Sequence, residues 1–301
     1  MPNISRPRRS VLYMPGSRER ALHKARSLPA DGLILDLEDA VGLAEKETAR
    51  GLVAETVRQR PFGSREVIIR INGLDTPWGV ADLEMAAIVG PDAILVPKVE
   101  DAATVQRVAA LLATLGAPER TRIWAMMETP LAMLNAPQIA GSSPRLSCLV
   151  MGTNDLVKEL HAVHTESRAP VVTALGLCVL AARAYKMSIL DGVHNAIQDQ
   201  DRLRLSCIQG REMGFDGKTL IHPSQIAVAN EIFGPSAADL DLARRYVDAF
   251  SEAEAEAEGR GVAVVDGQLV ENLHVENAKR LLMQAEAIAA LEAANLEAGA
   301  A

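Results

Sequence analysis

The chain has 301 residues, of which 49% are hydrophobic, and its 39 acidic and 31 basic side chains give a formal net charge of -8. A chain of this length buries a large core, and its acidic balance argues against a nucleic-acid surface. The longest apolar run with almost no charge, from Ala169 to Ala182, is well short of the ~20 residues that cross a membrane, so we expect no membrane partner.

Short apolar runs alternate with longer amphipathic segments along residues 1–235. Helix-like segments such as RERALHKARSL and AATVQRVAALLATLG lie between the runs. Apolar strands that alternate with helices are typical of a parallel sheet covered by helices, and eight such units over roughly 220 residues predict a (β/α)8 TIM barrel. The eight predicted strands begin at Ser10, Gly32, Glu66, Ala93, Arg122, Leu146, Ser188 and Gly217.

Polar side chains follow each of these runs. Active sites of such barrels lie at the carboxyl ends of the strands, because the loops that lead into the helices meet there. We therefore expect residues 1–235 to form the catalytic domain. The side chains expected on its functional face are, in strand order, Arg18, Asp36, Glu38, Asp39, Arg70, Lys98, Glu128, Asp155, Asp191 and His222.

Two of these acids, Glu128 in METP and Asp155 in GTND, follow consecutive strands in equivalent places. Each alone is also compatible with a helix cap or a first-turn acid that the helix dipole favours. Two converging carboxylates repel each other unless a hard cation lies between them, and oxygen ligands suit Mg²⁺. We predict that both bind Mg²⁺, with Mn²⁺ as the alternative ion, and that water and substrate oxygens complete the coordination.

Arg70 stands within an apolar run, where it forms either a buried ion pair or, beside a metal, a fork for a substrate carboxylate or oxyanion. Asp36 and Glu38 are two residues apart and so share one face of their strand. They either orient metal-bound water or pair with Arg70. We predict catalytic roles for these three residues and leave both alternatives open.

Lys98 and His222 offer other chemistry. A lysine whose pKa is lowered by burial forms a Schiff base, which would make Lys98 the centre of a metal-free mechanism, although an exposed or ion-paired lysine is more common. His222, in the sequence IHP, is either a general base or a turn-forming residue with a satisfied ring.

The chain continues past the barrel through residues 236–301, which we predict to form a C-terminal lid extension. The helical segment DLDLARRYVDAFSEAEAEAE leads to GVAVVDGQLVEN, where Asp266-Gly267 between two apolar arms predicts a β-hairpin. A further helix follows. Glu271, just after the hairpin, would lie on an arm able to cover a barrel mouth.

The cysteines and the first residues bear on location. Cys148, Cys178 and Cys207 are an odd number without metal-binding spacing, which favours buried reduced thiols over a disulfide framework. The first ten residues, MPNISRPRRS, are basic but contain no apolar segment of a secretory signal. We therefore expect a cytoplasmic protein.

A series of motifs, taken in order, resembles the HpcH/HpaI aldolase and citrate lyase β-subunit family. The motifs are RSVLYMPGSRERALHKA, GLILDLEDAV, VIIRINGLDTPWG, ILVPKVE, METP, MGTNDL, GFDGKTLIHPSQIAVANEIF and VVDGQLVEN. The resemblance covers nearly the whole chain and is strongest for the malyl-CoA and citramalyl-CoA lyases. It implies a Mg²⁺-dependent TIM barrel, and homotrimers or hexamers in which the C-terminal lid completes the site of a neighbouring subunit.

The resemblance also implies roles for single residues. Glu128 and Asp155 match the metal ligands of the family, and Arg70 matches the arginine that binds the reacting acyl oxygens or carboxylate. The residues that it places against CoA or along the CoA path are Tyr13, Arg18, Lys24, Ile221, His222 and Pro223. The sequence departs from the lyases at the lid acid, which is an aspartate in them and Glu271 here.

The implied reaction cleaves or forms a short 3-hydroxyacyl-CoA such as malyl-CoA or citramalyl-CoA, with acetyl-CoA and a 2-oxoacid, glyoxylate or pyruvate, as the other partners. Glu271 would protonate the enolate of acetyl-CoA, or abstract the proton in the reverse direction. Three alternatives stay open. They are a malyl-CoA thioesterase on the same scaffold, a citrate lyase β subunit acting on an acyl-carrier thioester, and a non-catalytic homologue.

Overall fold

The computed structural model describes residues 6–256 and 262–300. The first five residues of the basic start of the chain, and part of the acid-rich segment predicted after the barrel, lie outside the described residues. Contacts divide the chain into two compact units, whose main parts are Arg8–Phe233 and Gly234–Ala293.

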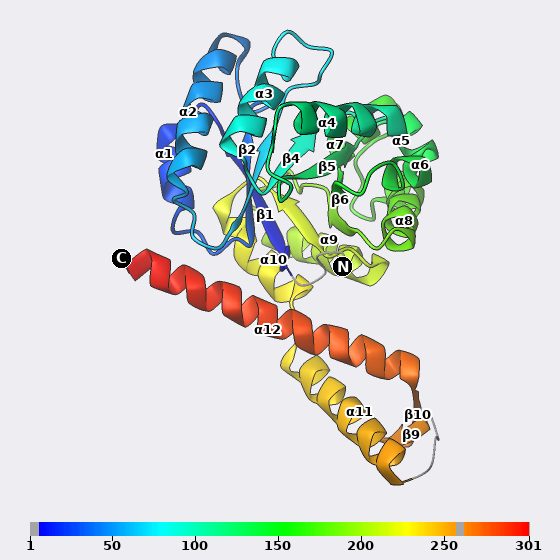
Figure 1. The fold of residues 1–301 in the computed structure, drawn as a ribbon. Coiled ribbons are helices and arrows are strands. Elements are labelled where there is room, and N and C mark those ends of the chain that lie inside the picture. The colour runs from blue at the N-terminus through cyan, green and yellow to red at the C-terminus, as the bar shows by residue number, and fades with distance from the viewer. Residues whose placement is uncertain (1–5, 257–261, 301) are drawn as a thin grey trace. The chain divides into compact units, whose positions relative to one another are not determined.

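The first unit is a closed barrel of eight parallel strands in chain order, surrounded by helices (Figure 1). The strands are β1 (Ser10–Pro15), β2 (Gly32–Asp36), β3 (Glu66–Arg70), β4 (Ala93–Val96), β5 (Arg122–Met127), β6 (Leu146–Met151), β7 (Ser188–Asp191) and β8 (Gly217–Leu220). β8 pairs with β1 and thereby closes the ring. Each strand begins at the residue predicted from the sequence, so the (β/α)8 barrel is confirmed.

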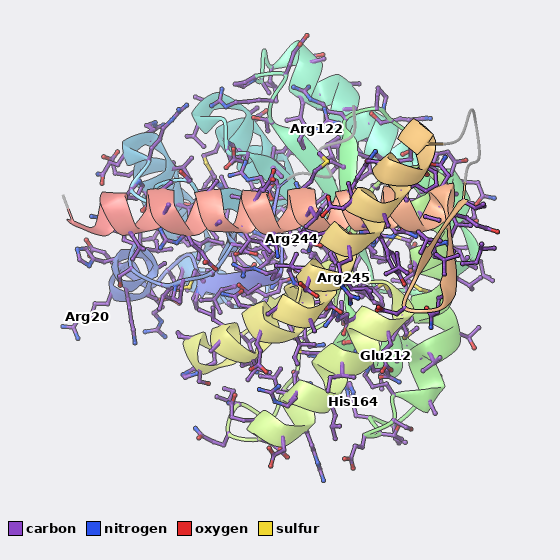
Figure 2. The ribbon with its side chains drawn as sticks, turned by 90° about the horizontal axis from the view of Figure 1, so that it is seen from below. Arg20, Arg122, His164, Glu212, Arg244 and Arg245 are labelled. Atoms are coloured by element: carbon purple, nitrogen blue, oxygen red, sulfur yellow. The ribbon has the colours of Figure 1, made fainter. Side chains whose placement is uncertain are left out.

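Amphipathic helices cover the strands. They are α1 (Glu19–Ala25), α2 (Lys46–Gln59), α3 (Gly79–Val89), α4 (Ala102–Thr114), α5 (Pro130–Leu134), α6 (Ala136–Ala140), α7 (Thr153–Glu159), α8 (Ala169–Ala184), α9 (Gln200–Met213) and α10 (Ile226–Phe233), with short 3-10 turns η1 (Leu43–Glu45) and η2 (Pro223–Gln225). In α4, for example, Val105, Val108 and Leu112 form the buried face. Charged side chains such as Arg20 of α1 point away from the barrel (Figure 2).

Most strand residues are apolar because both faces of the sheet are buried. Leu33 and Leu35 of β2 belong to the core between strands and helices. Ile34, between them, belongs to a second core inside the barrel, together with Trp124 of β5. Arg8 closes the amino-terminal end of this inner core, where its guanidinium lies 5.3 Å from the ring centroid of Trp124 and pairs with Glu66 at 2.6 Å. Continuous apolar runs are therefore what this architecture requires.

The second unit has its own small core. Its elements are α11 (Ala237–Glu256), β9 (Val262–Val265), β10 (Gln268–Glu271) and the part of α12 (Asn272–Ala300) up to Ala293. β9 and β10 pair antiparallel across Asp266 and Gly267, which both have positive φ, so the predicted hairpin is confirmed. Val265 and Val270 pack with Phe250 of α11.

The structure bears on two further predictions, which concern the cysteines and membrane-spanning helices. All three cysteines are free and buried, as predicted. No helix within the described ranges is long and apolar enough to span a membrane.

Candidate functional site

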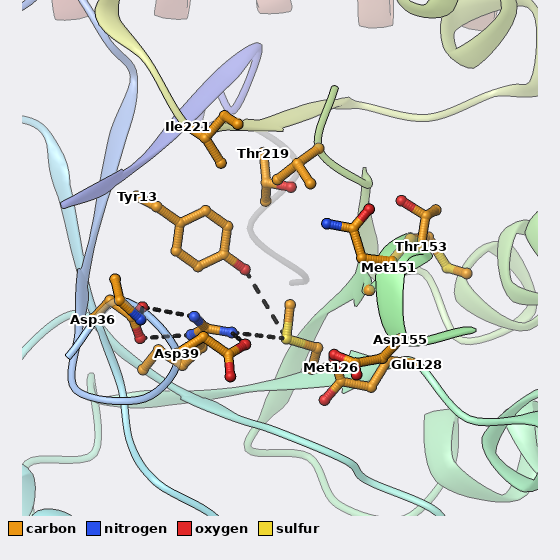
Figure 3. Close-up of a pocket in the computed structure, with 15 residues that line it drawn as sticks. Tyr13, Asp36, Asp39, Met126, Glu128, Met151, Thr153, Asp155, Thr219 and Ile221 are labelled. Atoms are coloured by element: carbon orange, nitrogen blue, oxygen red, sulfur yellow. Dashed lines mark hydrogen bonds and ion pairs between the residues drawn. The ribbon is translucent and has the colours of Figure 1, made fainter. Parts of the chain in front are cut away.

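A cavity of about 290 Å³ lies at the carboxyl ends of the barrel strands (Figure 3). The residues of its wall that the sequence had singled out are Tyr13, Asp36, Asp39, Arg70, Glu128, Asp155 and Ile221. They lie in, or directly after, six different strands of the barrel, so closure of the sheet brings together side chains that are far apart in the chain.

Glu128 is a buried acid whose carboxylate faces this cavity. It follows β5 and is only 2% exposed. Its Oε1 accepts the backbone N–H of Lys98 at 2.7 Å. Thr129 caps the next helix instead, since its hydroxyl accepts the N–H of Ala132. The helix-cap alternative is therefore wrong for Glu128, and its carboxylate is available to a ligand.

Asp155 approaches Glu128 from the next strand along the chain. It lies in the first turn of α7, is partly buried and lines the same cavity. The turn between β6 and α7 passes so close to Glu128 that a Cβ at Gly152 would be 2.4 Å from the Cβ of Glu128. Only glycine fits at this position. The GTND motif thus combines a close-packed turn with an acid three residues later.

The two carboxylates act on each other electrostatically. Burial raises the pKa of Glu128 to about 7, the N–H of Lys98 opposes the shift, and the charge of Asp155 adds to it. A divalent cation between the two acids would remove this repulsion. Within residues 6–256 and 262–300, no three His, Cys, Asp or Glu side chains form a metal-binding group, so Glu128 and Asp155 would leave coordination positions for water and ligand oxygens. This all-oxygen donor set fits Mg²⁺.

Arg70 lies across the cavity in a cage of acids. Asp36, which is fully buried, binds its guanidinium through two hydrogen bonds of 2.6 Å, from Nε and from Nη2 (Figure 3). The remaining nitrogen, Nη1, lies 2.7 Å from Glu38 and 3.2 Å from Asp39. Of the two alternatives for Asp36 and Glu38, the structure shows the pairing with Arg70. The guanidinium also stacks on Tyr13, 4.9 Å from its ring centroid.

The cage shares a single positive charge among three carboxylates. Burial raises the pKa of Glu38 to about 8, Arg70 lowers it, and Asp39 raises it again. Arg70 cannot offset the burial of Glu38 because Asp36 already holds two of its nitrogens. Asp39 is 70% exposed and is the partner that solvent reaches most easily. A ligand anion could therefore replace Asp39 at Nη1 without disturbing Asp36.

Several other predicted residues of the barrel unit are not part of the cavity wall. His222 is exposed and accepts the N–H of Ser224, so the turn-forming alternative is the one that the structure shows. Arg18 and Lys24 are exposed at the start and in the last turn of α1. Glu271 ends β10 in the second unit, where it is exposed. Pro223 begins η2.

The structure disagrees with the predicted roles of two residues at strand ends, Lys98 and Asp191. The side chain of Lys98 is exposed, and its backbone rather than its amine contacts Glu128, so the burial that a Schiff-base lysine needs is missing. The prediction for Asp191 is wrong. Its fully buried carboxylate binds Lys218 of β8 at 2.7 Å and Arg168 before α8 at 2.6 Å, and it is not part of the cavity wall.

The sequence did not reveal every residue of the site. Asn154 lines the cavity beside Asp155 and exchanges two hydrogen bonds, of 3.1 and 2.8 Å, with Asn195 after β7. Val193 lines the cavity from the same loop as Asn195. Neutral amides and a valine carry no charge signal, and the position of Asn154 next to Asp155 was the only indication.

Comparisons with known proteins agree with this geometry. The family model described as HpcH/HpaI aldolase/citrate lyase matches residues 9–223. A (3S)-malyl-CoA thioesterase of Cereibacter sphaeroides is 54% identical over 293 residues, which cover 97% of this chain and 100% of the relative. The citrate lyase subunit beta of Escherichia coli K12 is 33% identical over 288 residues, 94% of each protein.

Solved structures that resemble this chain include CitE and citrate lyase beta subunit structures. CitE from Mycobacterium tuberculosis, in complex with magnesium, acetoacetate and coenzyme A, has a TM-score of 0.73 and 29% identity, over 92% of this chain and 97% of that chain. The citrate lyase beta subunit of the same organism, with oxaloacetate and magnesium, has a TM-score of 0.67 and 29% identity, over 77% and 100%. The matched motifs, the barrel and the full-length relatives together show that this chain belongs to the HpcH/HpaI aldolase/citrate lyase family.

Proposed function

We propose that this protein is a Mg²⁺-dependent enzyme that hydrolyses the thioester of a short hydroxyacyl-CoA of the malyl-CoA type. The observation that carries the proposal is the placement of Glu128 and Asp155 in one cavity with the caged guanidinium of Arg70. The relative with 54% identity over its full length is named (3S)-malyl-CoA thioesterase. Magnesium and CoA occur together in a related structure.

The residues of the cavity would have two roles, metal binding and stabilisation of negative charge. Mg²⁺ held by Glu128 and Asp155 would supply a Lewis acid for the oxygens of the hydroxyacid. Arg70 is preorganised, because Asp36 fixes two of its nitrogens, and a ligand anion that displaces the exposed Asp39 would reach Nη1. Such a donor stabilises negative charge that develops on the thioester oxygen. Hydrolysis then adds water across the C–S bond and yields the free acid and free CoA.

A second candidate function is the carbon–carbon lyase reaction implied by the family resemblance. The family model and the citrate lyase relative with 33% identity favour it. In this reaction Glu271 would protonate the enolate of acetyl-CoA.

Both candidate functions share further proposals about the chain. Residues 236–301 would serve as a lid and in oligomerisation, and the protein would be a homotrimer or hexamer in the cytoplasm. CoA would be contacted by Tyr13, Arg18, Lys24 and the Ile221–Pro223 turn.

Product analysis separates the two reactions. The protein is incubated with Mg²⁺ and malyl-CoA or citramalyl-CoA, and free CoA, acetyl-CoA and the 2-oxoacid are followed together. We expect free CoA and malate without glyoxylate, and no turnover in EDTA. Equal amounts of acetyl-CoA and glyoxylate, lost in Glu271→Ala, would instead establish the lyase. Absence of turnover with both substrates would overturn both candidates.

The raised pKa of Glu128 makes Mg²⁺ binding depend on pH. The ion needs the ionised carboxylate, and a proton competes for it below a pKa of about 7. The apparent Mg²⁺ affinity should therefore weaken by up to about tenfold for each pH unit below that value and level off above it. Isothermal titration calorimetry from pH 5.5 to 8.5 measures this. A flat profile across the whole range would contradict Glu128 as a ligand.

A further inference from the structure

A buried lysine lies behind the acid cage, outside the cavity. Lys46, at the start of α2, is only 5% exposed. Its ammonium donates to the carbonyl oxygens of Leu37 at 2.9 Å and Glu38 at 2.7 Å, and to the side-chain oxygen of Asn72 at 2.7 Å. An ammonium group has three N–H donors, so each of them has an acceptor. None of these acceptors is a carboxylate, so a simple ion pair does not explain why the charge is buried here.

Lys46 belongs to a connected set of polar side chains, which we call the Lys46 network: Lys46, Arg50, Asn72 and Asp82. The Oδ2 atom of Asp82 accepts the backbone N–H of Asn72 at 3.0 Å and its side-chain amide at 2.6 Å. Arg50 donates to the other oxygen of Asp82 at 2.6 Å. Asp82 is fully buried. The network therefore joins α2 and α3 to the chain directly after β3.

The network holds the two chain segments that build the cage around Arg70. Leu37 and Glu38 directly follow Asp36, and the side-chain amide of Asn72 donates to the carbonyl of Leu37 at 2.9 Å. The N–H of Leu37 donates to the carbonyl of Arg70 at 2.9 Å. Carbonyl groups of this loop thus face the network, while its carboxylates pair with Arg70 on the cavity side.

Asp36 adds to the rigidity of the same loop. Its two carboxylate oxygens accept the N–H groups of Glu38 at 2.9 Å and Ala40 at 3.0 Å, in addition to the guanidinium. The loop is therefore held by Asp36 from one side and by Lys46 from the other. Loss of Lys46 would leave the carbonyls of Leu37 and Glu38 with one donor each, the Asn72 amide and the N–H of Val41. The loop would then be held less firmly, and the acids that orient Arg70 would move with it.

We propose that the Lys46 network positions Arg70 for catalysis by fixing the loop of residues 36–39. The ammonium of Lys46 donates to backbone and amide oxygens and lies 5.7 Å from the ring centroid of Trp78, and none of these residues is part of the cavity wall. Lys46 is therefore a positioning residue and not a catalytic one. The effect on turnover rests on the proposed function, whereas the effect on the loop does not. The residue pattern that marks the network is Lys46 and Arg50, one helical turn apart on α2.

The test compares two buried cations in the full-length protein. Lys46→Met removes the ammonium at similar side-chain length. Arg65→Met is the matched control, because Arg65 is equally buried at 5% exposed and also donates to backbone carbonyls, those of Leu28 and Phe62, but it lies before β3. Hydrogen exchange followed by mass spectrometry reports on the loop, and steady-state kinetics report on catalysis.

In Lys46→Met, the amides of residues 37–41 and 70–72 should exchange at least about tenfold faster, while the core strands keep their rates. The kcat should fall by about 10–100-fold with KM changed less than about threefold, because a misplaced catalytic group lowers turnover more than binding. Arg65→Met should change neither the exchange of residues 37–41 nor kcat. Asp82→Asn keeps the side-chain shape. It should accelerate exchange in residues 70–72 and lower kcat, as Lys46→Met does.

Two results would overturn the proposal. One is unchanged exchange in residues 37–41 of a folded Lys46→Met protein. The other is an equal loss of kcat in Lys46→Met and Arg65→Met, which would mean that both cations only stabilise the barrel. If Lys46→Met does not fold, Asp82→Asn decides, and unchanged exchange in residues 70–72 of that variant would overturn the proposal. Absence of turnover in the wild type would overturn the proposed function alone, and the exchange data would still decide whether the network fixes the loop.

Discussion

Glu128→Gln is expected to lower kcat/KM by about 10²–10³-fold, since a Lewis acid contributes several kcal/mol to such a reaction. Glutamine keeps the shape of the side chain, and its carbonyl oxygen can still accept the N–H of Lys98. It lacks the charge that a divalent cation requires. Calorimetry should show no saturable Mg²⁺ binding at millimolar concentrations, and the kinetic loss should not be recovered by adding more Mg²⁺.

The stability of the same variant distinguishes a lost ligand from a damaged fold. The pKa of Glu128 is raised in the folded protein, so above about pH 7 its ionised form disfavours folding in the absence of metal. Glutamine removes this penalty, and Glu128→Gln should be at least as stable as the wild type in EDTA at pH 8. Glu231→Gln, an exposed carboxylate paired with Arg204, is the control and should leave activity unchanged. Full activity of Glu128→Gln would contradict the metal site.

Arg70→Met is expected to lower the free energy of unfolding by about 3–5 kcal/mol, because it leaves Asp36 as a buried charge without its partner. Asp36 is fully buried and binds both Nε and Nη2 of Arg70. The double variant Asp36→Asn with Arg70→Met removes both charges and should recover most of the lost stability. Urea denaturation at pH 7 measures the three free energies, and their non-additivity gives the coupling between the two residues.

Activity in this series separates the two roles of Arg70. The double variant removes the buried Asp36–Arg70 ion pair but lacks a guanidinium at the cavity, so its kcat/KM should stay as low as that of Arg70→Met. A folded double variant with wild-type turnover would show that Arg70 serves the barrel only. Such a result would remove the oxyanion role while leaving the metal site intact.

The strands were predictable because their signal is local. A strand buried on both faces is a nearly continuous apolar run, as GLIL of β2 is, and Gly32 and Asp36 mark where this run starts and stops. The hairpin was predictable for a similar reason, since Asp266-Gly267 suits a turn with two positive φ angles. In both cases the information lies within ten residues of the feature.

The partners within the site were not predictable in the same way. Asp36 and Arg70 stand opposite each other in the β2–β3 register, which is a property of the closed sheet and not of either strand alone. The error for Asp191 has a related cause. Successive side chains of a strand point to opposite faces, so the last residue of a strand points either into the cavity or toward the helices. Asp191 points toward Arg168 and Lys218.

The Lys46 network had the weakest signal of all. Lys46 and Asn72 are separated by 26 residues, and their contact depends on how α2 and α3 pack against the sheet. A lysine and an arginine one turn apart near the start of a helix would ordinarily be assigned to its solvent-exposed face. Lys46 is buried because the loop after β2 packs against its ammonium group, and the sequence around Lys46 does not indicate that contact.

Closure of the barrel between β1 and β8 has a consequence for synthesis of the chain. Ser10 pairs with Lys218, so roughly 200 residues must be translated between the two partners. At ribosomal rates of about 5–20 residues per second, this interval lasts about 10–40 s. During that time one edge of β1 has unpaired N–H and C=O groups and an apolar surface, which invites association with other nascent chains. Yield in the cell therefore depends on how this edge is shielded until the last strand leaves the ribosome.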